Sequence, residues 1–328
     1  MKQQILKIAL TIALAIPAIS NAQVVMTAND AIGTTSFNAA GTWSPAGAPA
    51  AGSTYSTLGF LLRSPTTAGS YTFTGNSLTV GGGNGGGANT FSPVSANNDA
   101  LIFKVSAITL TVNNLILDGG QIRDGNGVGQ AASLDGNITV TANGGSFIAQ
   151  DTNFINSAIS GSGTIYIGDN GQTTDQRARI VFTSGASTFN GNIMMTNTAV
   201  NTPNRSILDF AAGSLMNFKI GANGVNNKIS GVGTVTFSGS FTFDLSTADN
   251  TIGDSWDIVD PSVLSTYNSL TVNGFTQNGT SWDDLTKGVD YDFSQTTGLL
   301  TVEAVPEPSI LALCGMGLAG LVGWKRRK

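Results

Sequence analysis

The sequence predicts an all-β protein: a right-handed parallel β-helix (β-solenoid) with a β-rich C-terminal cap, and a hydrophobic helix at each terminus. Of the 20 acidic residues 18 are Asp, and 42 residues are Gly, two types that favour turns over helix interiors. Short alternating segments recur roughly every 8–12 residues and group at about 20–25, a spacing typical of one β-helix coil. An Ile-Ser-Gly-x-Gly-Thr unit occurs at 159–164 and again at 229–234. An antiparallel β-sandwich or jelly roll is the alternative, because it also needs short strands and turns.

Residues 1–22 have the pattern of a secretory signal peptide. Lys2 and Lys7 precede an apolar stretch from Ile8 to Ile19, and the sequence Ser20-Asn21-Ala22 places small residues at both specificity positions before the cut. Cleavage is expected between Ala22 and Gln23, and a retained N-terminal membrane helix is the alternative.

The body of the chain is predicted in three parts. Residues 23–69 form an N-terminal cap with the first strands, residues 70–249 form the β-solenoid repeats, and residues 250–303 form a β-hairpin cap. A solenoid needs such caps because its end coils expose their core. The glycine-rich stretch 81–87 is predicted to be a loop, since the Gly-Lys-Ser/Thr of a phosphate loop does not follow it.

The C-terminal cap is rich in aromatic residues. Tyr291 to Val302 reads as a hairpin around the turn Gln295–Gly298. The large side chains in this region are Trp256, Phe275, Trp282, Tyr291 and Phe293. We expect them to pack in a core, and a sugar-stacking platform is the alternative.

Composition excludes several function classes. Six of the 15 basic residues and one of the 20 acidic residues lie in the terminal segments, which leaves nine against 19 and a body net charge of −10. Nucleic acid is therefore not an expected partner. The chain has no His, which excludes Ser-His-Asp and Cys-His catalysis and His-ligated zinc. Its only Cys, Cys314, lies in the C-terminal segment.

Three patterns suggest chemistry without specifying it. Asp- and Asn-rich turns at 124–127, 135–137 and 168–171 offer oxygens for calcium, but a turn conformation explains the same residues. The many Asp residues make chance carboxylate pairs for glycoside hydrolysis uninformative. Arg177 and Arg179 near Asp169 and Asp175 suit polysaccharide lyase chemistry only by analogy of fold. We predict no enzyme, no catalytic residue and no cofactor, with Ca²⁺ at the turns as the alternative.

Residues 305–328 form a C-terminal segment in three parts. Pro306-Glu307-Pro308 comes first, an uncharged apolar run follows at 309–324, and four basic residues end the chain. The run is slightly shorter than the ~20 residues that span a bilayer, and we predict a transmembrane helix over 309–324. The basic end holds the C-terminus on the cytoplasmic side. A plain membrane anchor is the simplest interpretation.

These three parts in this order closely resemble the PEP-CTERM sorting signal of Gram-negative bacteria. The resemblance implies that Pro306, Glu307, Pro308, Arg326 and Arg327 are sorting residues read by exosortase, a membrane-embedded processing enzyme. It also implies export across the inner membrane to the cell surface or the exopolysaccharide matrix of a biofilm. The C-terminal helix would hold the protein in the membrane transiently, until cleavage near the Pro-Glu-Pro motif, or permanently.

Residues 70–245 loosely resemble the passenger repeats of autotransporters, on the strength of the repeated Ile-Ser-Gly-x-Gly-Thr unit. The working hypothesis is a secreted, surface-sorted, non-enzymatic structural or adhesive protein with exopolysaccharide as a partner. The alternative is a carbohydrate-binding or polysaccharide-degrading β-helix protein.

Overall fold

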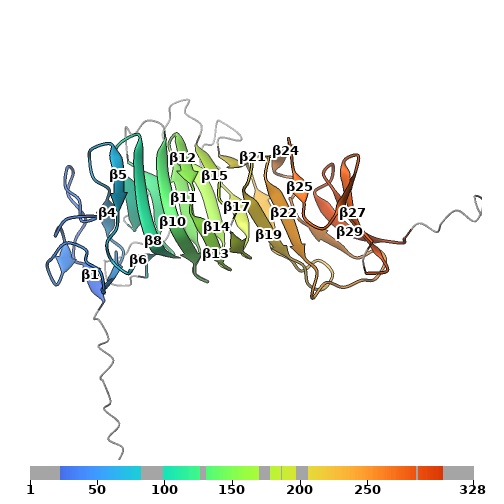
Figure 1. The fold of residues 1–328 in the computed structure, drawn as a ribbon, viewed down its shortest axis with the longest axis horizontal. Coiled ribbons are helices and arrows are strands. Elements are labelled where there is room, and N and C mark those ends of the chain that lie inside the picture. Colours follow the sequence, from blue (N-terminus) through green and yellow to red (C-terminus); the bar gives the residue numbers. More distant parts are fainter. Residues whose placement is uncertain are drawn as a thin grey trace, which may run out of the picture.

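The computed structural model describes residues 23–82, 99–125, 131–169, 178–185, 187–196, 206–285 and 287–305. These residues form strands β1 to β29 and no helix, in one elongated body (Figure 1). The all-β prediction is confirmed. The predicted terminal helices, over 8–19 and 309–324, lie outside the described residues, as do Ala22 and the five sorting residues. Among the described residues no helix is long and apolar enough to cross a membrane.

A 14-stranded sheet, the large sheet, runs along the body. Its main path is β2 (Trp43–Ser44), β1 (Val24–Met26), β3 (Thr54–Ser56), β6 (Ser77–Gly81), β8 (Ile108–Asp118), β10 (Ala132–Val140), β12 (Thr152–Ile155), β15 (Arg179–Phe182), β18 (Ile207–Phe210), β21 (Thr234–Phe237) and β24 (Leu264–Tyr267). Off this path, β5 (Gly69–Thr72) pairs with β8, and β13 (Ala158–Gly161) pairs with β10 and with β16 (Thr188–Phe189).

Two further sheets accompany the large one. The second sheet has the order β20 (Ile229–Gly231), β17 (Ile193–Met195), β14 (Ile165–Asp169), β11 (Gly145–Ala149), β9 (Gln121–Asp124), β7 (Ala100–Phe103) and β4 (Leu61–Arg63). The third has the order β19 (Leu215–Lys219), β22 (Ser240–Asp244) and β25 (Thr271–Val272). We call these three sheets together the parallel body.

Pairing in the parallel body is parallel throughout, apart from β1 with β2. Paired residues in the parallel pairs lie between 20 positions apart, as Ser146 and Tyr166 do, and 39 positions apart, as Leu61 and Ala100 do. Such pairing requires a crossover between partners, which a hairpin does not supply. The antiparallel sandwich alternative is therefore wrong for these sheets.

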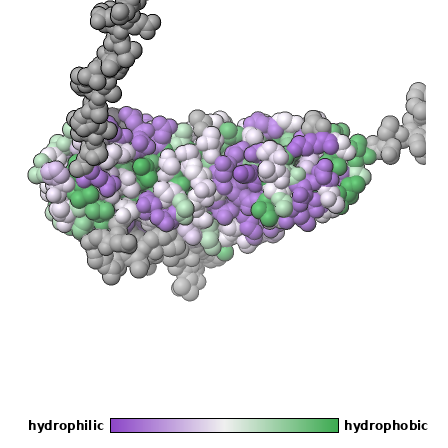
Figure 2. Space-filling model, turned by 90° about the horizontal axis from the view of Figure 1, so that it is seen from below, coloured by the Kyte–Doolittle hydropathy of each residue, from purple (hydrophilic) through white to green (hydrophobic). Residues whose placement is uncertain are grey.

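The inward residues of successive strands stack on one another. Phe182, Phe210, Phe237 and Tyr267 are partners in register on β15, β18, β21 and β24. Their ring centroids are 5.5, 5.3 and 5.0 Å apart along this column. Contacts of this kind add about 0.5–1.5 kcal/mol per aromatic pair beyond the area that is buried. On the face shown in Figure 2, hydrophilic and hydrophobic residues are interspersed.

The two copies of the repeated unit form corners between sheets. Gly161 ends β13 of the large sheet, and the chain then enters β14 of the second sheet. Gly231 ends β20 of the second sheet, and the chain then enters β21 of the large sheet. The copies therefore occupy different corners, so they are not equivalent positions of one repeat. Both copies have a Gly at positive φ, +100° at Gly161 and +92° at Gly231. At each, an added Cβ would collide with a carbonyl oxygen of a neighbouring strand, so only Gly fits.

An antiparallel five-stranded sheet, the C-terminal sheet, follows. Its order is β23 (Ser255–Asp257), β29 (Leu299–Glu303), β28 (Asp290–Ser294), β27 (Ser281–Asp284) and β26 (Thr276–Asn278). The β28–β29 pairing confirms the predicted hairpin. Within the range predicted as a cap, β24 and β25 nevertheless extend the parallel sheets.

The aromatic residues of this region pack in the core, as expected. Trp256, Trp282, Tyr291 and Phe293 are buried, and Phe275 packs against the same cluster while partly exposed. The Phe293 ring lies 5.7 Å from that of Phe241, which joins the C-terminal sheet to the parallel body. A sugar-stacking platform built from these rings is thus excluded.

At the other end, Asn29 and Asp30 satisfy the edge of the second sheet. Asp30 N donates to Leu61 O at 3.0 Å, and Asp30 Oδ2 accepts from Arg63 N at 2.9 Å. Asn29 Oδ1 accepts from Leu61 N at 2.8 Å. These bonds replace the ladder that another strand would provide, and so they protect β4 from edge-to-edge association.

The corner glycines give a first prediction. Gly231 and Gly253 have nearly the same φ, +92° and +98°, but a Cβ at Gly231 would collide with Met195 O, whereas nothing lies within 4 Å of one at Gly253. Gly253→Ala should lower the free energy of unfolding by about 1–2 kcal/mol, the cost of the left-handed backbone alone. Gly231→Ala should lose about 3 kcal/mol or more, since the clash is added. Urea unfolding measures both, and equal losses would contradict close packing at this corner.

Candidate functional site

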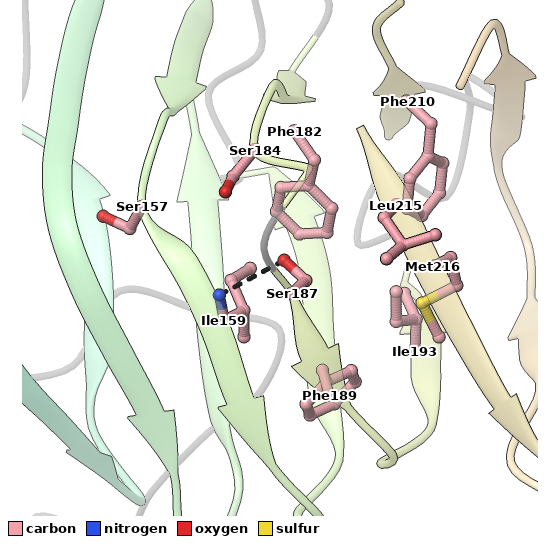
Figure 3. A pocket seen from close by; sticks show the side chains of 10 residues that line it. All are labelled: Ser157, Ile159, Phe182, Ser184, Ser187, Phe189, Ile193, Phe210, Leu215 and Met216. Atoms are coloured by element: carbon pink, nitrogen blue, oxygen red, sulfur yellow. Dashed lines mark hydrogen bonds between the residues drawn. The ribbon is translucent and has the colours of Figure 1, made fainter. Parts of the chain in front are cut away.

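An internal crevice in the parallel body is too small to be a ligand site (Figure 3). It offers only about 10 Å³, roughly the room that a single water needs. Its walls are mainly core side chains, among them Phe182, Phe189 and Phe210. Ser187 Oγ lies within it and accepts a hydrogen bond from Ile159 N at 3.2 Å. The crevice therefore belongs to the packing of the sheets.

A second depression is polar and much larger, about 310 Å³. We call it the polar groove. It is lined by Asn223, Gly224, Asn226, Lys228, Ser255 and Asp257. Residues 223–228 precede β20, and Ser255 and Asp257 belong to β23, so the groove lies where the C-terminal sheet meets the parallel body.

Hydrogen bonds hold the two sides of the polar groove together. Ser255 N donates to Asn223 Oδ1 at 2.9 Å, and Gly224 N donates to Ser255 O at 3.0 Å. Asn226 Nδ2 donates to Asp257 O at 2.6 Å. Gly224 has a φ of +75°, which permits the tight turn between the two asparagines. The lining is therefore ordered by the backbone of β23.

Lys228 and Asp257 are the charged residues of the groove lining, and Asp260 lies beside Lys228. Lys228 Nζ lies 3.5 Å from Asp257 Oδ2 and 3.9 Å from Asp260 Oδ2. Hydrogen bonds from the hydroxyl and the N–H of Ser262 lower the pKa of Asp260, with a smaller contribution from Lys228. The Asp260 carboxylate is thus suited to accept hydrogen bonds rather than to supply a proton.

The outward face of the C-terminal sheet carries a cluster of carboxylates. Asp283 pairs directly with Asp292, and Asp290 pairs with Glu303. Burial, followed by the charges of these neighbours and Asp284, raises the pKa of Asp290 to about 6. Burial also raises the pKa of Asp292. Within the described ranges, no three His, Cys, Asp or Glu residues are grouped so that they could hold a metal ion.

Asp124 and Asp135, from the turns suggested for calcium binding, accept hydrogen bonds within the protein. Asp124 Oδ2 accepts from Gln150 N at 2.9 Å, and Asp135 Oδ1 accepts from Asn156 Nδ2 at 2.8 Å. Asp135 to Asn137 lies inside β10, where Gly136 forms a bulge at a φ of +105°, so the turn prediction is wrong there. The remaining residues, Asn126, Gly127 and the side chains of 169–171, lie outside the description.

Arg179, which the sequence suggested for lyase chemistry near Asp169 and Asp175, has a different partner in the structure. Arg179 on β15 forms an ion pair with Asp209 on the neighbouring strand β18. Arg177 and Asp175 lie outside the described residues. Gln23, the expected first residue of the mature protein, is exposed.

The sequence did not indicate the polar groove, because its two sides lie about 30 residues apart and neither carries a recognisable motif.

Comparison with protein families locates one known element. The model of the PEP-CTERM protein-sorting motif matches residues 304–328. The C-terminus carries a PEP-CTERM motif. It implies processing by an exosortase-type enzyme, with export and sorting to the surface. No curated protein and no solved structure matches the chain, so the autotransporter-like resemblance of the body gains no support.

The carboxylate cluster predicts a pH dependence. Because the pKa of Asp290 is about 6 when folded and 3.8 ordinarily, its charged form is disfavoured by folding. Its contribution to stability is therefore greatest at low pH and is lost as the pH rises from about 4 through 6. Asp290→Asn should raise the free energy of unfolding at pH 7 by about 1 kcal/mol, allowing for solvent screening of the neighbours. The gain should vanish below pH 4 in urea titrations.

Asp244→Asn is the contrasting control. Hydrogen bonds from the hydroxyl and the N–H of Ser246 lower the pKa of Asp244, so its charged form is favoured by folding. This change should reduce stability at pH 7. A gain from both variants would show that net charge, and not the local carboxylate cluster, determines the effect.

Proposed function

We propose that this chain is a secreted, surface-sorted, non-enzymatic structural or adhesive protein, whose body is a right-handed β-solenoid. The PEP-CTERM motif at 304–328 is the observation that carries the proposal of sorting. Parallel pairing over steps of 20–39 residues supports the solenoid, since each step accommodates one coil that passes through two or three sheets.

The C-terminal segment acts as a removable address in this proposal. Among the described residues, β29 is the last strand and ends at Glu303, and Val302 is the last buried hydrophobic residue. Pro306-Glu307-Pro308 therefore follows directly after the folded body. Cleavage near the motif removes the apolar run at 309–324 without breaking a ladder hydrogen bond of the described sheets. Before cleavage, the apolar run holds the protein in the inner membrane.

A structural role fits the character of the body. The chain has no His, and among the described carboxylates Asp209 forms an ion pair, Asp135 accepts a hydrogen bond from Asn156, and Asp283 and Asp292 belong to the carboxylate cluster. The exopolysaccharide matrix of a biofilm is the destination we favour. A long stack of strands supplies rigidity and a large surface there, and no reaction is needed for either.

A carbohydrate-binding role is the second candidate function. The polar groove favours it, because the groove presents amide, hydroxyl, ammonium and carboxylate groups together. Polysaccharide degradation is less well supported, since Arg179, the described residue suggested for it, is paired with Asp209.

Sorting is tested by removing residues 305–328 and fractionating the cells. The truncated protein should leave the cell-surface fraction and collect in the periplasm or the medium. An unchanged distribution would overturn the proposal of sorting.

Processing is tested by the mass of the mature protein. Wild-type protein should begin at Gln23 and lack the basic end, because both signals are removed. A variant with Pro306, Glu307 and Pro308 replaced by Ala should keep its C-terminus and stay in the inner membrane. An intact C-terminus in the wild-type protein would establish a permanent anchor instead.

A further inference from the structure

We propose that the polar groove, formed by Asn223, Gly224, Asn226, Lys228, Ser255 and Asp257, binds a neutral saccharide. Its volume, about 310 Å³, is at the lower end of the ~300–1,000 Å³ found for small-ligand sites. This inference rests on the second candidate function, carbohydrate binding, and names its ligand class; the sorting and structural role does not require a ligand.

The groove combines donors and acceptors that protein contacts leave available. Asn223 uses its Oδ1 to accept from Ser255 N, and Asn226 uses its Nδ2 to donate to Asp257 O and Asn227 O. Among the residues that the structure describes, Asn223 Nδ2, Asn226 Oδ1 and Ser255 Oγ have no hydrogen-bond partner. One amide therefore offers a donor, the other an acceptor, and the hydroxyl offers both. A sugar hydroxyl needs this mixture, because it donates and accepts at once.

The lining is fixed before a ligand arrives. Asn223 is held at both ends, because its N–H donates to Asp249 Oδ2 at 2.9 Å and its Oδ1 accepts from Ser255 N. Trp256, between the two β23 residues of the groove, is buried and donates from Nε1 to Ala222 O at 2.9 Å. Little side-chain entropy is lost on binding such a surface, which favours affinity.

Charge selects a neutral ligand over an acidic one. Lys228 is the groove's only cation among the described residues, and Asp257 and Asp260 already surround it. The body as a whole has a net charge of −10. A uronate or sulfated chain would therefore be repelled, while neutral hydroxyls bond to the Asp257 carboxylate and the Lys228 ammonium. The same ammonium disfavours a metal ion beside Asp257.

None of the six residues that line the groove is aromatic, so a sugar ring cannot stack on an aromatic side chain there. Hydrogen bonds would carry recognition without stacking, so we expect a weak site, with a Kd on the order of 1 mM for a short oligosaccharide. A polysaccharide contacted by many copies of the protein would still be held firmly, because linked weak contacts add avidity.

Affinity electrophoresis of the full chain in mild detergent tests the proposal. The gels contain one of three neutral polysaccharides, dextran, mannan or laminarin, or one of two acidic ones, alginate or polygalacturonate. We expect retardation by at least one neutral polysaccharide and by neither acidic one. The retarding polysaccharide is then titrated with variants of the groove and with matched controls outside it.

Two variants change the groove without removing its internal bonds. Ser255→Ala deletes the available hydroxyl, and Asn223→Asp keeps the acceptor for Ser255 N while replacing the amide donor. Each should weaken binding at least fivefold. Their controls are Ser133→Ala on β10 and Asn278→Asp on β26, which make the same chemical changes away from the groove and should bind like the wild type.

Three results would overturn the proposal. They are no retardation by any neutral polysaccharide, equal binding by the groove variants and the wild type, or stronger retardation by the acidic polysaccharides. Urea unfolding of each variant shows that a loss of binding does not come from a loss of fold. The mass and fractionation experiments on the C-terminus test the sorting role separately, so either proposal can fail alone.

Discussion

In-register parallel hydrogen bonding is the constraint on which the rest of this molecule depends. It places each residue beside the corresponding residue of the next strand, so an inward Phe meets an inward Phe, as Phe210 meets Phe182 and Phe237. The same geometry operates outside the core, where Asn156 Nδ2 donates to Asp135 Oδ1 and Thr183 Oγ1 donates to Asn156 Oδ1. Stability then accumulates strand by strand, which suits the proposed solenoid.

Such a stack must be closed at its ends, and the two ends are closed by different means. Asn29 and Asp30 satisfy the open edge of β4 with two side chains and one N–H. At the C-terminal end an antiparallel sheet covers the core with Trp256, Tyr291 and Phe293. The other face of that sheet carries the carboxylate cluster, where burial and the neighbouring carboxylates raise the pKa of Asp290.

The change from parallel to antiparallel pairing also creates the polar groove. Asn223 and Gly224 form hydrogen bonds with the backbone of Ser255 on β23. These loop contacts join the two sheets where no strand-to-strand ladder connects them. The proposed saccharide site and the sorting motif consequently belong to the same end of the chain's fold, since β23 pairs with β29 and the motif follows β29.

The sequence alone determined the all-β class, the hairpin at β28–β29 and the C-terminal motif, because turn residues, alternation and a contiguous tail are local signals. It also identified Gly161 and Gly231 as a repeated feature, but only the tertiary structure showed that they turn different corners, since the partner carbonyl comes from a distant strand. Asp135 to Asn137 looked like a turn and is a bulge inside β10, because pairing with β8 overrides the local preference. The polar groove was likewise decided by tertiary structure, for its two sides meet only once both sheets have formed.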